Sequence, residues 1–156
     1  MILGVLSDTH GNRKFLEQAR KLAVNHFGAS VLIHLGDNYS DAEVLMLKGT
    51  PVWAVPGLWC AAYHSPSIPR ARLEGAGTLL IHFAHAEQDL EPESVERAQI
   101  ILTGHTHRYR LDFLDGKIWM NRGIKAVPPR SVSSLLQPTP WSAVSSDSTA
   151  RPSWLR

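Results

Sequence analysis

Two short aliphatic runs decide the fold, residues 1–8 (MILGVLSD) and residues 30–37 (SVLIHLGD), because each ends in an aspartate at a polar turn. A short run of aliphatic and β-branched side chains bounded by turn residues is typical of a strand buried on both faces. Between them, residues 12–28 carry apolar side chains at three- and four-residue spacing, which predicts a helix that starts at Asn12 and stops at Gly28. The chain therefore opens as strand, helix, strand.

The same alternation continues along the chain. A capping box of Ser40 and Glu43 predicts a second helix that Gly49 closes, and residues 52–55 predict a third strand. Strands and helices that alternate at this spacing indicate parallel βαβ units with right-handed crossovers, and hence an α/β fold. Further elements are expected as strands at residues 78–83 and 100–102, a short helix at 92–98, and a hairpin of 110–114 with 117–120 around Asp115-Gly116.

Length and composition narrow the class of protein. The 156 residues with 44% hydrophobic content suit one domain, which we place at residues 1–130. A formal net charge of +2 is far from the basic face of a dedicated nucleic-acid binder, and a lone Cys60 makes no internal disulfide. The first residues predict a strand rather than a signal peptide, and no apolar run is long enough to cross a bilayer. We therefore expect a cytoplasmic protein with no membrane partner, ending in a Ser/Pro-rich and poorly ordered tail at residues 131–156.

Side chains that bind metals follow several of the predicted strands. In a parallel sheet the carboxyl ends of the strands converge on one edge, so ligands far apart in sequence meet in one cleft. A mixture of carboxylate and imidazole favours a pair of transition-metal ions, which can activate a bridging hydroxide for attack on phosphorus. The residues at these positions are Asp8, His10, Asp37, His82, His85, His105 and His107.

Structural explanations compete with this one at each position taken alone. Asp8 with His10 is also consistent with a turn capped by an aspartate. Gly36 before Asp37 is equally common where a strand simply ends in a loop. Two imidazoles two residues apart at His105 and His107 are more specific, because they have little structural purpose. Three histidines stay outside the predicted site: we assign His26 and His34 to packing or surface roles and leave His64 unassigned.

Four segments together resemble the calcineurin-like metallophosphoesterases, closest to their small bacterial and archaeal phosphodiesterase branch. They are Ser7-Asp8-Thr9-His10, Leu35-Gly36-Asp37-Asn38, Ile81-His82 and Gly104-His105-Thr106-His107, and the likeness runs through residues 1–130. The resemblance implies a two-sheet α/β sandwich with flanking helices and a binuclear, metal-dependent phosphodiesterase. The late segments Asn121-Arg122-Gly123 and Pro128-Pro129-Arg130 are similar to two further family motifs.

The resemblance also implies a role for each ligand. One divalent ion would be held by Asp8, His10, Asp37 and His107, and the other by Asp37, His82 and His105, with Asp37 as the bridge. His82 is preferred to His85 because it directly ends its strand. Asp37, His105 and His82 are then the residues expected to carry catalysis, with manganese as the expected metal and nickel, cobalt, zinc or iron as alternatives.

The chain departs from the family after its third strand. The family places a metal-binding asparagine after a glycine there, whereas this chain has Leu58 after Gly57. Either Cys60, or less readily His64, approaches the second metal instead, or the second site is weaker and activity is reduced. A histidine that is proposed as the general acid in larger members is also absent, which favours substrates with good leaving groups.

Three functions therefore stay in competition. The first is a hydrolase of a small phosphate ester, more readily a diester than a monoester. Nucleic acid stays open as a further substrate, and a homo-oligomer stays open as the assembly state. The second is a catalytically weakened protein of the same fold that serves as a binding or scaffold module. The third is a purely structural α/β domain.

Overall fold

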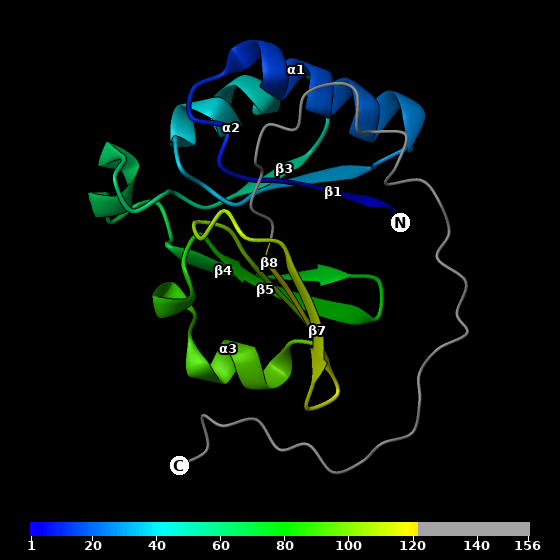
Figure 1. The fold of residues 1–156 in the computed structure, drawn as a ribbon, viewed down its shortest axis with the longest axis vertical. Coiled ribbons are helices and arrows are strands. Elements are labelled where there is room, and N and C mark those ends of the chain that lie inside the picture. Colours follow the sequence, from blue (N-terminus) through cyan, green and yellow to red (C-terminus); the bar gives the residue numbers. More distant parts are fainter. Residues whose placement is uncertain (122–156) are drawn as a thin grey trace. The chain divides into compact units, whose positions relative to one another are not determined.

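A computed structural model describes residues 1–121 of the chain, and within them two β-sheets face each other (Figure 1). One sheet has the order β1-β2-β3 and is parallel throughout, and the other has the order β4-β5-β6-β8-β7. In the second sheet β5, β6 and β8 run parallel, while β4 and β7 are antiparallel edges. The strands are β1 (Leu3–Leu6), β2 (Val31–His34), β3 (Val52–Ala54), β4 (Ala71–Ala76), β5 (Leu79–Ala84), β6 (Ile100–Thr103), β7 (Arg110–Leu114) and β8 (Lys117–Asn121).

Helices cover the outer faces of the two sheets. Helices α1 (Arg13–Lys21) and α2 (Tyr39–Met46) lie on the three-stranded sheet, and α3 (Pro92–Arg97) lies on the other (Figure 1). Three single turns complete the described part, η1 (Leu22–His26), η2 (Ala61–His64) and η3 (Glu87–Asp89). This arrangement confirms the two-sheet α/β sandwich with flanking helices.

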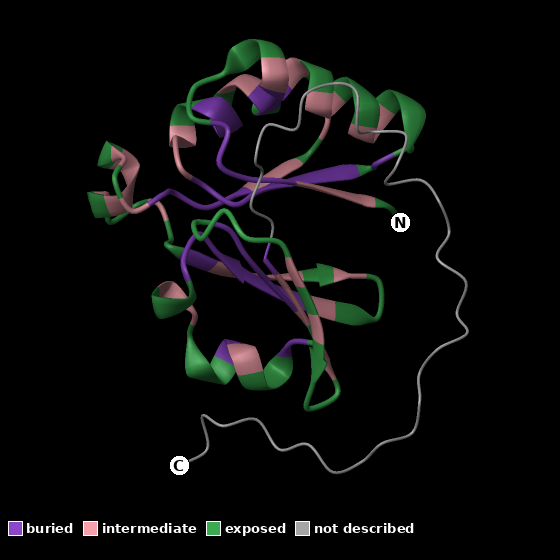
Figure 2. Cartoon of the chain, in the orientation of Figure 1, coloured by how far each residue is buried: buried purple, intermediate pink, exposed green. Residues whose placement is uncertain are grey.

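The core forms where the inner faces of the sheets meet. Side chains from both sheets make one buried cluster, which consists of Ile33, Leu35, Val55, Ile81, Phe83 and Leu102. A second cluster lies between the three-stranded sheet and its helices and includes Leu16, Leu32 and Leu45. Strand β2 supplies both clusters because successive side chains point to opposite faces, and Figure 2 shows this strand buried along its length.

The start of α1 agrees with the boundary predicted from the sequence, whereas the start of α2 differs from the predicted one. Asn12 caps α1 as predicted, its side chain accepting from the Phe15 N–H at 3.0 Å. After Lys21 the helix widens into the π-turn η1 before Gly28 ends it at φ +70°. The predicted capping box at Ser40 and Glu43 is wrong, because α2 starts earlier and Asn38 is its cap.

The hairpin after residue 110 is confirmed, with Asp115-Gly116 as its turn. Strand β4 was not predicted; it pairs with β5 along its whole length. None of the helices described is long and apolar enough to cross a membrane. The Ser/Pro-rich tail, Gly123 and Pro128-Pro129-Arg130 lie outside the described residues.

Candidate metal centre

The turns that follow β1 and β2 leave the same edge of the three-stranded sheet. The strands are parallel with Leu6 opposite His34, and the Leu35 N–H donates to the Leu6 carbonyl at 2.9 Å. Asp8 and His10 follow β1 within four residues, and Asp37 follows β2 within three. The predicted convergence of these residues is therefore present in the structure.

The turns after β5 and β6 reach the same place from the other sheet. The Gly104 N–H donates to the His85 carbonyl at 2.9 Å, which ties these two turns together. Gly104 also packs against Ser7, so closely that a Cβ at Gly104 would overlap the serine side chain. This glycine has no positive φ; its lack of a side chain is what lets the two sheets meet beside Asp8.

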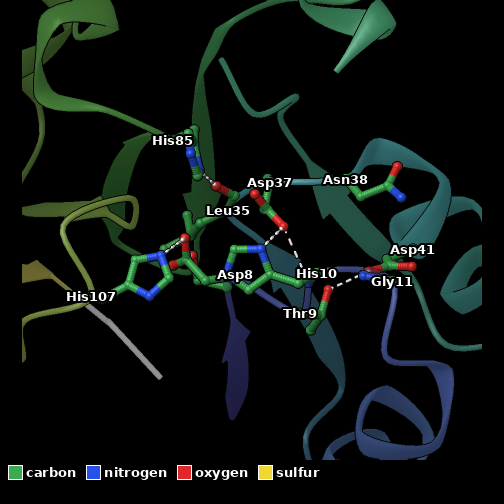
Figure 3. Close-up of polar contacts among 12 residues, drawn as sticks. Asp8, Thr9, His10, Gly11, Leu35, Asp37, Asn38, Asp41, His85 and His107 are labelled. Atoms are coloured by element: carbon green, nitrogen blue, oxygen red, sulfur yellow. Dashed lines mark hydrogen bonds and ion pairs between the residues drawn. The ribbon is translucent and has the colours of Figure 1, made fainter. Parts of the chain in front are cut away.

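Asp8, His10 and His107 form a cluster of donors. One ligand atom from each lies within 4.8 Å of the other two, although the residues come from both sheets. His107 Nε2 is 3.4 Å from Asp8 Oδ1, and the two imidazole rings are 5.1 Å apart between centroids (Figure 3). One carboxylate and two imidazoles form a donor set that suits a divalent transition metal.

Asp37 joins this cluster through His10. Its Oδ2 is 2.7 Å from His10 Nδ1 and accepts from the His10 backbone N–H at 3.1 Å. The Asp37 side chain is 19% exposed and that of His10 56% exposed, so both face solvent, whereas the Asp8 side chain is only 1% exposed. A small molecule can thus reach the cluster from the side of Asp37 and His10.

His85 and His105 lie next to each other at the ends of β5 and β6, with ring centroids 5.1 Å apart. The Leu35 carbonyl, 2.7 Å from His85 Nδ1, can only accept, so this nitrogen carries the proton and Nε2 is left as an electron-pair donor (Figure 3). Histidines that bind metals are commonly oriented by such a bond to a carbonyl. Burial lowers the pKa of His85, an effect that the Leu35 carbonyl partly opposes, and the lowered pKa favours the neutral ring that a metal needs.

The preference for His82 over His85 is wrong. Ile81 and Phe83 point into the core between the sheets, so strand alternation turns His82 to the opposite face, toward α3. There His82 Nδ1 donates to the Arg72 carbonyl at 2.9 Å, and Nε2 accepts from the Glu91 N–H at 3.1 Å. Both ring nitrogens are committed to main-chain groups, which makes His82 a packing residue.

Backbone conformation singles out the same residues. Six residues other than glycine have a positive φ in the described part of the chain, a conformation that is uncommon and strained for side-chain-bearing residues. One is Asp115 in the hairpin turn, and the other five are Asp8, His10, Asp37, His105 and His107. Asp and His adopt this conformation more readily than other residues, and its concentration at the ends of three neighbouring strands is the pattern expected of a functional site.

A buried network holds the turn that carries Asp8 and His10. Asp41 Oδ2 accepts from the Thr9 hydroxyl at 2.5 Å and from the Gly11 N–H at 3.0 Å (Figure 3). His34 Nε2 lies 3.3 Å from the Thr9 hydroxyl oxygen, and burial lowers the pKa of this histidine to about 4. Sequence analysis missed Asp41; the signal available was an acidic side chain in the first turn of a helix that directly follows Asp37.

The turn with His105 and His107 has its own support. The Asn121 amide donates to the Gly104 carbonyl at 2.7 Å and to the Thr103 hydroxyl at 2.9 Å, and its oxygen accepts from the Thr106 hydroxyl at 3.1 Å. The family resemblance singled out Asn121 without a role. In the structure Asn121 closes the turn.

The residues after β3 line a hollow beside Asp37. Its volume is about 440 Å³, and it is lined by His10, Asp37, Asn38, Trp59, Cys60 and Ala61. Cys60 is among these lining residues, and its thiol donates to the Gly57 carbonyl at 3.2 Å. His64 is not among the lining residues, and His26 stacks edge-on against Phe27 at the end of the first helix.

The comparisons with known proteins agree with this fold. The model of the calcineurin-like phosphoesterase superfamily domain matches residues 1–135, so the chain belongs to that superfamily. No curated protein matches the chain significantly.

Solved structures with the same fold include a predicted phosphoesterase from Streptococcus pneumoniae TIGR4, 21% identical, covering 78% of this chain and 71% of that one with a TM-score of 0.59. A novel archaeal phosphodiesterase is 17% identical; the match covers 79% of this chain and 84% of that one, with a TM-score of 0.61. Vps29 from Entamoeba histolytica in complex with zinc is 19% identical; the match covers 79% of this chain and 74% of that one, with a TM-score of 0.57. At these identities the likeness shows a shared fold.

Proposed function

We propose that this member of the superfamily is a phosphodiesterase that depends on two divalent metal ions. The observation that carries the proposal is the coincidence of strained backbone with metal-binding side chains, at five positions from three separate turns. The orientation of His85 by the Leu35 carbonyl adds a sixth donor. The proposed ligands are Asp8, His10, Asp37, His85, His105 and His107.

The donors divide into two groups around Asp37. Asp8, His10 and His107 would hold one cation, since their ligand atoms already lie within 4.8 Å of one another. His85 and His105, which lie next to each other, would hold the second. Asp37, in contact with His10 and open to solvent, would serve both ions; manganese, which accepts mixed oxygen and nitrogen ligands, is the expected metal.

Two such cations would act as Lewis acids on the phosphoryl oxygens and would lower the pKa of a water for attack on phosphorus. The chain's own residues prepare the site for that chemistry. The Ser7 hydroxyl donates to Asp8 Oδ2 at 2.5 Å, which fixes the carboxylate and leaves Oδ1 facing His107. The hollow beside Asp37 and His10 is wide enough for a small ester and open to solvent on that side.

Leaving-group chemistry favours diesters with acidic alcohols. The hollow contains no imidazole besides His10, which is already engaged with Asp37, so a free general acid for the leaving oxygen is not among its lining residues. Substrates whose leaving group needs no proton should therefore react fastest. The archaeal phosphodiesterase that shares the fold supports a diesterase, and the zinc-bound Vps29 supports a metal site in this fold.

The decisive experiment is an assay of the purified chain with a bis-nitrophenyl phosphodiester and the matching monoester. Manganese, nickel, cobalt and zinc are added in turn after treatment with a chelator, and bound metal is measured by elemental analysis. We expect turnover of the diester with at least one metal, faster than that of the monoester, and close to two ions per chain. Absence of turnover with all four metals would overturn the proposal.

One observation favours a second candidate, a scaffold or binding module that has kept the fold. Leu58 stands where the family resemblance places a metal-binding asparagine, and leucine cannot bind a metal. Vps29 from Entamoeba histolytica, which is not named as a phosphoesterase, has the same fold. Fewer than one tightly bound ion per chain, together with a silent assay, would favour this candidate.

A further inference from the structure

The turn after β3 presents a tryptophan to solvent. The Cys60 N–H donates to the Gly57 carbonyl at 3.2 Å, which closes a tight turn with Leu58 and Trp59 at its tip. Trp59 is 86% exposed, more than any other large apolar residue in the described part of the chain. An indole presents a large flat apolar face with one polar N–H, and at Trp59 most of this face is free to contact a ligand.

The turn is locked against the loop that carries Asp37. A Cβ at Gly57 would overlap the Asp37 backbone, and one at Gly36, where φ is +90°, would lie 2.8 Å from the Gly57 nitrogen. The two loops thus touch main chain to main chain. The distance between the tryptophan backbone and Asp37 is fixed by this contact, since neither loop can shift without the other.

The far side of the turn is anchored as well. The Tyr63 hydroxyl donates to Asp89 Oδ1 at 2.7 Å, and the guanidinium of Arg70 lies over the Tyr63 ring, 4.2 Å from its centroid. Arg70 Nε also donates to the Tyr63 carbonyl at 3.0 Å. Trp59 therefore sits on a segment held at both ends, which is the arrangement expected of a preorganised binding surface.

Trp59 shares its hollow with two proposed metal ligands. The hollow of about 440 Å³ is lined by His10, Asp37, Asn38, Trp59, Cys60 and Ala61, and Trp59 supplies the largest apolar face among these residues. A phosphate ester held at His10 and Asp37 would direct a substituent toward the indole. Binding sites for small molecules commonly combine one apolar wall with a few converging polar groups.

We propose that Trp59 forms a subsite for a planar aromatic ring, and that the substrates are phosphodiesters of nucleosides whose base stacks on the indole. The subsite rests on the proposed phosphodiesterase function and adds the class of substrate to it. Nucleobases suit such a platform because stacking depends on the face of the ring and little on its identity. An interface with a protein would need a wider apolar surface, whereas the residues that share the hollow are mostly polar or small.

The test compares two ligands that differ only in the base, adenosine 5′-monophosphate and ribose 5-phosphate. Their dissociation constants are measured by calorimetry on the manganese-loaded full chain. We expect the nucleotide to bind roughly 5- to 150-fold more tightly, the factor that stacking one base on an aromatic side chain supplies. W59A should abolish this preference while leaving the ribose 5-phosphate affinity and the metal content unchanged.

Two further variants control for shape and for exposure. W59F keeps an aromatic face and should retain most of the preference. L47A removes another exposed apolar side chain, on the C-terminal cap of α2, and should behave as the wild type. Equal affinities for the two ligands in the wild-type chain would overturn the subsite, as would a preference that survives in W59A.

The same preparations separate this proposal from the proposed function. Turnover of the nitrophenyl diester without a preference for the nucleotide overturns the subsite alone. If turnover and metal are absent, quenching of tryptophan fluorescence by the nucleotide in the wild type but not in W59F still supports the subsite. Equal quenching in both overturns it, and so does an oligomer that dissociates on the W59A change, which would make Trp59 an interface residue.

Discussion

The turn after β1 and the turn after β6 have the same local design in different surroundings. Each places two proposed ligands around a threonine, Asp8-Thr9-His10 in one and His105-Thr106-His107 in the other. In each, both ligands have a positive φ, and the threonine hydroxyl donates to the side chain of an Asp or Asn on another element. The two turns thus combine the same local conformation with a support from a distant element.

The supports of the two threonines differ in burial and in charge. Thr9 is 3% exposed and donates to the carboxylate of Asp41, which is itself buried beside His34. Thr106 is exposed and donates to the neutral amide of Asn121. We therefore expect the first turn to be more sensitive to mutation and to pH than the second, although the two look alike in sequence.

Asp37 lies outside both turns but contacts the first, and its replacement should have the largest effect. D37N keeps the shape of the side chain and removes the charge that two cations would share, so we expect activity to fall by roughly 10³-fold or more. Metal content should fall as well, while the far-UV circular dichroism stays the same. D115N is the matched control, because Asp115 also has a positive φ but lies in a distant hairpin. Activity within a few-fold of wild type in D37N would contradict the bridging role.

Removal of the two threonine hydroxyls tests the comparison directly. T9V leaves Asp41 and His34 each short of a buried hydrogen bond, and we expect the free energy of unfolding to fall by about 2–4 kcal/mol. Thr106 is itself exposed, so water can approach from its side and replace part of the bond to the Asn121 oxygen, and the loss in T106V should be about 0–1 kcal/mol. Urea unfolding of both variants measures the difference. Similar losses in the two would mean that burial does not distinguish the turns.

Local sequence patterns predicted most of the strands and helices, and the structure places Asp8, His10, Asp37 and His107 close together, as those patterns predicted. Strand ends that carry Asp or His could be read from local patterns, since each pattern lies within a few residues. Asp41 was missed because its partners, Thr9 and Gly11, lie some 30 residues away and belong to another turn. Such a contact depends on packing, which no local pattern contains.

The error at His82 has a different origin. The alternation of β5 already contained the answer, because Ile81 and Phe83 are apolar and His82 must then point to the other face. The sequence analysis favoured His82 because it ended the predicted strand, and the structure extends that strand to Ala84. Position along the strand therefore outweighed the alternation of its side chains, which places His82 on the face away from the cluster.

The buried His34 makes the first turn sensitive to acid. Burial lowers its pKa from 6.5 to about 4, so between these values the unfolded chain binds a proton that the folded chain does not. Stability should therefore fall as the pH drops from 6.5 toward 4, by at most about 3 kcal/mol. H34Q, whose amide can still bond to Thr9, should flatten this dependence when urea unfolding is measured across the range. An unchanged slope in H34Q would assign the dependence to another group.

Cys60 should give the smallest effect. Its thiol donates to the Gly57 carbonyl, a bond that a serine hydroxyl can also make, so C60S should change stability by no more than about 0.5 kcal/mol. Diesterase activity with manganese should stay within a few-fold of wild type, because manganese does not depend on thiolate ligands. Zinc affinity is the sensitive measurement, since a thiolate favours zinc. If C60S weakens zinc binding at least 10-fold and spares manganese, Cys60 takes the place of the ligand that Leu58 cannot supply; equal zinc affinity leaves the second ion to His85, His105 and Asp37 alone.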